Sequence, residues 1–178
     1  LLVAYQDVPF SLPDDSIRKL LQLRYDGDCY TEYLEHQGYS QVDGDSISIR
    51  ATIPGSARDY FRDQSFGQFT PRFDVVGPVT LDNPRAHYGA NTASGSDKNA
   101  RAMVTEACRK AYEQNLADLS DYDGNGDGVV DFVYVVYAGS DEAQTAIEEC
   151  VWAHASTVSL TLGDMRIGRY ACSGELFV

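Results

Sequence analysis

The chain has 178 residues, a length that suits a single domain with a substantial hydrophobic core. Its 27 Asp and Glu residues outnumber its 14 Lys and Arg residues, so the net charge is −13 and the pI is about 4.4. This balance argues against nucleic-acid binding, because phosphates are bound by Lys and Arg.

The first 54 residues predict a strand, a helix and a polar connection. Leu1–Tyr5 is a short apolar run, typical of a buried strand. Positions 14–16 carry good N-cap residues for a helix. The apolar face of that helix holds Ile17, Leu20 and Leu21. We interpret the residues around Tyr30–Leu34 as a second helical piece and residues 41–54 as a loop or edge hairpin.

A capped helix and a strand are predicted next. Ser56 is a good N-cap for a helix over residues 57–64. Gln68–Val76 then alternates apolar and polar residues, the pattern of a half-buried strand.

A long amphipathic helix is predicted from about Asn99 to about Leu116. Its apolar face is formed by Met103, Val104, Ala107, Cys108, Ala111 and Tyr112. On this face Cys108 is expected to be a buried thiol rather than a nucleophile, because apolar burial raises the pKa of a thiol.

An acidic, glycine-rich loop follows and has the spacing of a calcium-binding loop. Side-chain oxygens fall at loop positions 1, 3, 5 and 9, which are Asp123, Asn125, Asp127 and Asp131. Gly128 occupies position 6, where such a loop turns sharply, and Val129 at position 7 offers a backbone carbonyl. The sequence therefore predicts a Ca²⁺ site.

Two features distinguish this loop from an EF-hand. Tyr134 stands where an EF-hand has its bidentate Glu, and the loop leads into a strand rather than a helix. Because Ca²⁺ takes about six to eight oxygens, Asp121, a distant carboxylate or waters must complete the shell. The alternative is a solvated acidic turn, since Asp, Asn and Gly are ordinary turn residues.

The C-terminal part predicts the centre of a sheet. Phe132–Ala138 is apolar on both faces, which is typical of a central strand. Residues 160–169 predict a hairpin with Gly163 and Asp164 at its turn. Strands and helices alternate along the chain, so we expect an α/β fold, with α+β as the alternative, built on a mixed twisted sheet flanked by helices.

Cys29, Cys108, Cys150 and Cys172 show no C-x-x-C spacing, so structural zinc is not predicted. An even number of cysteines permits disulfides in a secreted protein, and a Cys150–Cys172 bridge would close a loop of about twenty residues. No signal peptide, transmembrane run or lipidation motif is visible, and the first residue is not Met. We interpret the chain as a piece of a longer product.

Several stretches match one family in their order along the chain. They are Leu1–Phe10, Gly55–Phe69, Val76–Val79, Tyr88–Gly89, the acidic loop with its strand, Trp152 with His154, and Tyr170–Leu176. Together they resemble the secreted zinc metallopeptidases of the immune inhibitor A type. The resemblance implies a zincin-like upper subdomain, extracellular localisation, and protein or peptide substrates.

The family's zinc ligands and general base lie on an H-E-x-x-H helix. This sequence contains no such motif, and the family places it shortly after the stretch that resembles Tyr170–Leu176. The resemblance therefore implies the N-terminal half of a catalytic domain. Its catalytic residues and its Zn²⁺ would belong to the C-terminal remainder, which becomes a partner of this chain.

By the same resemblance, the strand before the zinc helix lies at the edge of the cleft and pairs with an extended substrate. Ala171, Ser173 and Glu175 are the candidate substrate-binding residues. An ordinary edge or core strand is the alternative.

A non-catalytic, calcium-stabilised extracellular module that lacks the zinc helix is the alternative function. His36, His87 and His154 are too far apart in sequence to share a helical face, and no G-x-S-x-G motif occurs. A zinc site assembled from these three histidines is therefore not predicted, and neither is a serine nucleophile. His154, close to Trp152, is expected to be packed or hydrogen-bonded.

Overall fold

The computed structural model describes residues 1–12, 16–22, 41–42, 45–46 and 56–176. The chain divides into two compact units. The larger unit contains Leu1–Ser11 and Val76–Val178, and the smaller contains Leu12–Val75. A single domain over residues 1–178 stays a prediction.

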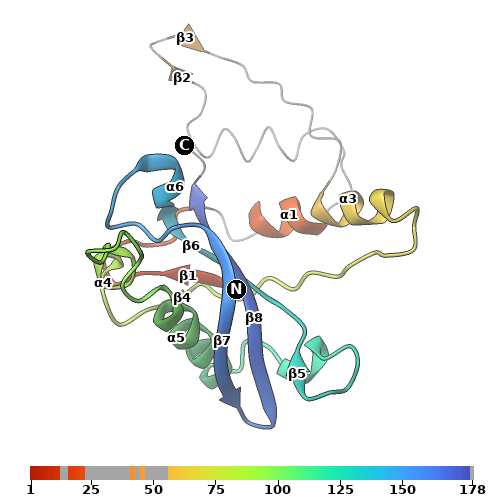
Figure 1. The fold of residues 1–178 in the computed structure, drawn as a ribbon. Helices are drawn as coiled ribbons and strands as arrows, with labels where there is room; N and C mark the ends of the chain where they lie inside the picture. Colours follow the sequence, from red (N-terminus) through yellow and green to blue (C-terminus); the bar gives the residue numbers. More distant parts are fainter. Residues whose placement is uncertain (13–15, 23–40, 43–44, 47–55, 177–178) are drawn as a thin grey trace. The chain divides into compact units, whose positions relative to one another are not determined.

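A six-stranded mixed sheet forms the larger unit (Figure 1). Five strands are paired successively in the order β4 (Val79–Thr80), β1 (Leu2–Ala4), β6 (Val133–Ser140), β8 (Met165–Leu176) and β5 (Val129–Val130), with β5 and β6 on the same side of β8. The sixth, β7 (His154–Leu162), pairs with β8 and is antiparallel to it, whereas all other pairs in this sheet are parallel. The predicted α/β fold with a mixed sheet is confirmed.

Strand β6 lies at the centre of the sheet, as its apolar sequence predicts. It pairs with β1 on one side, with Val3 opposite Tyr137, and with β8 on the other, with Val135 opposite Cys172. Residues 135–138 are all buried. The short strand β1 is buried along its whole length, because β4 and β6 flank it.

Helix α5 (Ala100–Glu113) supplies the main helical part of the core. Met103, Val104, Ala107 and Cys108 are between 0% and 4% exposed, so this part of the predicted apolar face is confirmed. The prediction that Tyr112 belongs to this buried face is wrong, because Tyr112 is 41% exposed. It lies in the last turn of the helix and places its hydroxyl beside the hairpin turn at Gly163.

Short elements connect the strands. They are α4 (Arg85–Gly89), the 3₁₀ helix η1 (Leu119–Tyr122) and α6 (Glu142–Thr145). Strands β7 and β8 form the predicted hairpin, in which Leu162 lies opposite Met165 and the turn falls at Gly163 and Asp164. None of the described helices is long and apolar enough to cross a membrane.

The smaller unit contains two helices in contact, α1 (Ser16–Gln22) and α3 (Ala57–Gln64), and a hairpin of β2 (Gln41–Val42) and β3 (Asp45–Ser46). The predicted cap of α3 is confirmed as a capping box. The Asp59 N–H donates to Ser56 Oγ at 3.2 Å, and the Ser56 N–H donates to the Asp59 carboxylate at 3.3 Å. The second helical piece predicted around residues 30–34 lies outside the described residues.

The predicted strand over residues 68–76 is wrong. These residues form no strand, although the Val76 carbonyl accepts from the Leu2 N–H of β1 at 2.8 Å. Phe69 and Phe73 instead pack on Phe61 of α3, with ring centroids 5.8 Å and 6.5 Å away. Alternating apolar residues can be buried against a helix as well as in a sheet, and Pro71 has no N–H to donate to a ladder.

Buried tyrosines fill the core beneath the sheet. The ring of Tyr5 lies 5.9 Å from Tyr88 and 6.2 Å from Tyr137, and all three side chains are at most 1% exposed. The Tyr137 hydroxyl donates to the carbonyl of Val151 at 2.7 Å. This hydrogen bond ties the segment before β7 to the central strand.

Replacing Tyr137 by Phe is therefore expected to lower the free energy of unfolding by about 1–3 kcal/mol, because the buried Val151 carbonyl loses its donor. Tyr134→Phe in the same strand is the matched control. Tyr134 is 48% exposed, so removal of its hydroxyl should change the free energy of unfolding by less than about 0.5 kcal/mol. Urea unfolding measures both, and equal effects would show that the bond to Val151 contributes nothing.

Candidate functional site

The acidic loop runs from η1 into β5 and is held at both ends. The Asp131 N–H donates to the carbonyl of Tyr122 at 2.8 Å, which closes the base of the loop. The Arg166 N–H donates to the carbonyl of Gly128 at 2.9 Å, and Val129 lies opposite Arg166 in the parallel pairing of β5 with β8. The loop is thus anchored to the longest strand of the sheet.

Its carboxylates accept hydrogen bonds from the backbone of the loop. Asp123 accepts from the N–H groups of Gly126, Asp127 and Gly128 at 2.8–3.0 Å. The pKa of Asp123 is lowered, chiefly by the Gly128 N–H. Gly128 has φ +76°, the left-handed conformation that the predicted sharp turn needs.

The other predicted ligands lie in the same loop. Asp127 accepts from the Val129 N–H at 3.0 Å, and Asp131 accepts from the Gly124 N–H at 3.1 Å. The Asn125 side-chain amide donates to Asp127 at 3.0 Å. Asp121 lies just before the loop, in η1. The structure therefore places all the sequence-predicted ligands in or beside one turn.

The loop offers oxygen donors, which suit a hard cation such as Ca²⁺. A carboxylate has about four lone-pair sites, and the three hydrogen bonds to Asp123 leave it further acceptor capacity. Within the described residues, however, no three His, Cys, Asp or Glu side chains are grouped so that they hold a metal ion. The ligand set stays a prediction.

Strand β8 contains the three candidate substrate-binding residues in different surroundings. Ala171 is flanked by Tyr134 of β6 and Ala155 of β7. Ser173 lies opposite Val136 of β6, and its hydroxyl is 3.0 Å from that of Tyr134. The β7 pairing ends at Cys172, so only the last residues of β8 lack this neighbour.

Glu175 is buried, with 2% of its surface exposed. Its carboxylate accepts from the N–H and hydroxyl of Ser11 at 2.9–3.1 Å and from the Gly139 N–H at 3.0 Å. These bonds join the segment after β1 to the end of β6. Glu175 thus acts as an internal anchor in this structure.

The open edge of the sheet on this side belongs to β7. Among the described residues β7 pairs only with β8, so its other edge carries backbone groups without a strand partner. Exposed and partly buried residues alternate from His154 to Val158, and both core contacts, Leu160 and Leu162, lie near the hairpin turn.

His154 is hydrogen-bonded on both ring nitrogens, as predicted. Nδ1 lies 2.6 Å from the carbonyl of Trp152, and Nε2 lies 2.8 Å from the Tyr170 hydroxyl. Because a carbonyl only accepts, Nδ1 carries a proton. His87 packs edge-on against Tyr88, with centroids 4.9 Å apart, and His36 lies outside the described residues.

The cysteines of the larger unit are free thiols. Cys108, Cys150 and Cys172 are all buried, and none of them forms a disulfide. The Cys150–Cys172 disulfide considered in the sequence analysis is therefore wrong. The Cys172 thiol instead lies 3.4 Å from Nδ1 of His154. Burial raises the pKa of Cys108 to about 11, and it raises the pKa of Cys172 to about 11 as well. Cys29 lies outside the described residues.

A cavity of about 550 Å³ was not predicted from the sequence. It lies between the loop before α5, the first turn of α5 and the start of β7. Asp97, Arg101, Glu142, Trp152, His154 and Ser156 are among its lining residues. Its lining residues come from separate stretches at 95–102, 142 and 152–156, so no local motif indicates it.

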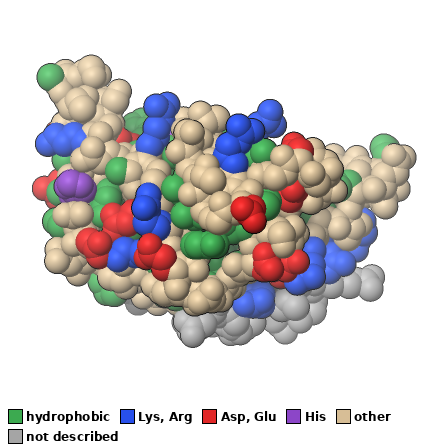
Figure 2. Space-filling model, turned by 90° about the horizontal axis from the view of Figure 1, so that it is seen from below, with side chains coloured by type: hydrophobic (Ala, Val, Ile, Leu, Met, Phe, Trp, Pro, Cys, Tyr) green, Lys and Arg blue, Asp and Glu red, His purple; other side chains and the backbone are tan. Residues whose placement is uncertain are grey.

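Charges of both signs are interspersed over the face shown in Figure 2. No broad basic field is visible on that face, in keeping with the net charge of −13. On this face the acidic residues are therefore interspersed with basic ones rather than gathered in one field.

Two comparisons with known proteins bear on this site. A family model described as the catalytic domain of immune inhibitor A peptidase M6 matches residues 1–165. Immune inhibitor A of Bacillus thuringiensis subsp. alesti is 29% identical over 183 residues, which cover 89% of this chain and 25% of that protein. The chain thus spans about a quarter of the length of this relative.

The raised thiol pKa values give a direct test of burial. At pH 8 fewer of these thiols are ionised than in an ordinary cysteine, and the thiolate is the reactive form. Iodoacetamide should therefore modify Cys108, Cys150 and Cys172 rapidly in urea and only very slowly in the folded protein. Mass mapping identifies the labelled sites. Rapid native labelling of Cys108, or a disulfide at Cys108, would contradict its position on the buried face of α5.

Proposed function

Because this chain belongs to the immune inhibitor A peptidase M6 family, we propose that it forms part of a secreted zinc-dependent endopeptidase. The family match over residues 1–165 carries this proposal. In such an enzyme a zinc ion held by the remainder of the catalytic domain would supply Lewis-acid chemistry to the scissile carbonyl and to a water molecule. The contribution of this chain is the sheet, the acidic loop and an edge strand that faces the substrate.

The zinc ligands and the general base are assigned to the remainder of the catalytic domain. The 178 residues contain no H-E-x-x-H motif, and the described histidines are bonded to the carbonyl of Trp152 or packed on Tyr88. Within the described part of the chain neither histidine belongs to a group of side chains that could hold zinc. This chain therefore positions substrate, and its partner segment performs the hydrolysis.

The substrate is proposed to bind as an added strand. An extended peptide that pairs with a sheet edge gains main-chain hydrogen bonds irrespective of its sequence. Strand β7 offers such an edge, and its Ala155 lies opposite the sequence-predicted candidate Ala171 of β8. Glu175 supports that arrangement from within, by holding Gly139 and Ser11.

Calcium binding by the acidic loop is the second part of the proposal. Asp123, Asp127 and Asp131 place three negative charges in one turn, and their repulsion opposes the loop conformation. A bound Ca²⁺ would replace this repulsion by coordination, with Asn125 and the carbonyl of Val129 as further ligands and Asp121 available. Calcium at millimolar concentration is an extracellular condition, which suits secretion.

A non-catalytic calcium-stabilised module is the alternative function. The same sheet, loop and edge strand would then bind an extended polypeptide without cleaving it. Zinc content and proteolysis by the whole protein separate the two functions.

The chain of 178 residues alone is expected to retain no stoichiometric zinc after dialysis and to cleave no casein, because the ligands and base are supplied elsewhere. The whole protein should retain about one zinc and lose proteolysis when a chelator removes it. Metal analysis and a casein assay measure both. Tight zinc and activity in the isolated chain would refute this division of roles, and a whole protein without either would support the non-catalytic module.

Calcium should raise the melting temperature of the protein. A ligand that binds only the folded state stabilises it by about 2.7 kcal/mol at a hundredfold excess over its Kd. Asp127→Ala should lower the melting temperature in millimolar calcium and change it little in excess chelator.

Asp63→Asn is the control for this measurement. Asp63 is an exposed residue of α3 that forms an ion pair with Arg62 at 2.9 Å, away from the acidic loop in sequence. Its replacement should leave the calcium-dependent difference unchanged. Equal melting of the unaltered protein in calcium and in chelator would mean that the loop is a solvated acidic turn.

A further inference from the structure

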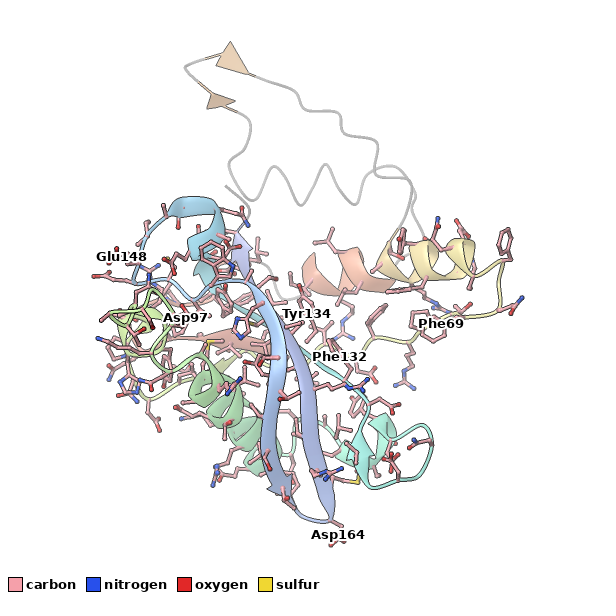
Figure 3. All side chains as sticks on the ribbon, in the orientation of Figure 1. Phe69, Asp97, Phe132, Tyr134, Glu148 and Asp164 are labelled. Carbon is pink, nitrogen blue, oxygen red and sulfur yellow. The ribbon has the colours of Figure 1, made fainter. Side chains whose placement is uncertain are left out.

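Three parts of the chain contribute the residues of interest in the cavity beside the start of β7. The loop before α5 contributes Asp97, α6 contributes Glu142, and the residues at the start of β7 contribute Trp152 and His154. The Trp152 side chain is 51% exposed, although a tryptophan normally buries most of its surface. Figure 3 labels Asp97, which lies on the loop before α5.

Two carboxylates, those of Glu142 and Asp97, form part of the cavity wall. Glu142 is only 9% exposed, and its carboxylate accepts a hydrogen bond from the Asn91 amide at 2.7 Å. Asp97 accepts from the Trp152 N–H at 3.2–3.3 Å. Neither carboxylate forms an ion pair in the part of the chain that the structure describes. Buried charges are normally paired, so this wall favours a cation in the cavity.

The basic residues of the cavity do not neutralise this wall. Lys98 and Arg101 are both exposed, and water therefore solvates their charges. Arg101 donates to the Ser156 hydroxyl at 3.3 Å rather than to a carboxylate. Among the charged residues that line the cavity, Glu142 is buried and Asp97 partly buried, whereas both basic residues are exposed.

The ligand chemistry that fits is an organic cation. The exposed indole of Trp152 provides an aromatic face, to which a guanidinium or ammonium group is attracted. A metal ion is less suited to this cavity, because His154 already bonds the Trp152 carbonyl and the Tyr170 hydroxyl through its ring nitrogens. The volume of about 550 Å³ is ample for the side chain of one amino acid.

The position of the cavity indicates that this cation is part of a polypeptide. His154 and Ser156 line it, and as alternate residues of β7 they project from the same face of the sheet. A peptide paired with the open edge of β7 presents every second side chain on that face. We propose that the cavity is a specificity pocket for an Arg or Lys side chain of the substrate, an inference that rests on the proposed peptidase function.

The test uses the zinc-loaded whole protein and peptides that carry Arg, Lys, citrulline or norleucine at each position in turn. At one position Arg and Lys should raise kcat/KM by about tenfold over the neutral residues. Glu142→Gln and Asp97→Asn should each remove most of this preference, because an amide keeps the hydrogen-bond acceptor and loses the charge. Cleavage of the neutral peptides should fall much less than cleavage of the Arg and Lys peptides, since only the charged side chains lose an ionic partner.

Glu148→Gln is the matched control. Glu148 is an exposed residue six positions after Glu142 in the same connection, and it does not line the cavity (Figure 3). This variant should keep the full preference. Binding gives a second measurement, since the exposed Trp152 lines the cavity. A cationic peptide should change the fluorescence of the protein but not that of its Trp152→Phe variant.

The outcomes separate the two proposals. Cleavage without a preference for Arg or Lys, or with a preference that survives both substitutions, overturns the specificity pocket and leaves the peptidase function standing. Quenching of Trp152 by free arginine, with no preference among peptides, assigns the cavity to a free cation and also overturns the proposal. A zinc-loaded protein that cleaves none of the peptides refutes the peptidase function itself, together with the pocket that rests on it.

Discussion

Strand β8 is hydrogen-bonded along both sides, and the positions of the candidate sites follow from this pairing. Along one side it meets β5 near Ile167 and β6 from Tyr170 onward. Along the other side it meets β7, from Met165 to Cys172. Because β8 is occupied on both sides over this length, an additional strand must join at β7. The acidic loop is likewise placed by β8, through the short parallel pairing of β5.

Buried polar groups then fix the connections that surround this strand. The Glu175 carboxylate binds Ser11 and Gly139, and the Tyr137 hydroxyl binds the carbonyl of Val151. Each of these bonds joins residues distant in sequence, and each would leave a buried polar atom unsatisfied if it were broken. The start of β7, and with it the wall of the cavity, is therefore held by the core.

The acidic loop and the cavity lie at different ends of β8. The loop is attached opposite Arg166, and β7 begins opposite Cys172. Six residues of strand span about 20 Å at about 3.3 Å per residue. A cation in the loop therefore acts on the stability of the sheet and does not contact a peptide bound at the start of β7. This separation makes thermal stability the appropriate measure for the loop, and kinetic preference the appropriate measure for the cavity.

Local patterns in the sequence determined the elements whose signals are short-range. The capping box at Ser56, the apolar run of β6, the turn at Gly163 and the buried face around Cys108 all follow from residues a few positions apart. The tertiary structure decided what depends on distant partners. It turned residues 68–76 onto Phe61 rather than into a sheet, left Cys150 and Cys172 unpaired, and brought Asp97, Glu142 and Trp152 around one cavity. The physical reason is that alternation or cysteine spacing specifies a face or a loop length, whereas the partner of that face is chosen by the packing of the whole chain.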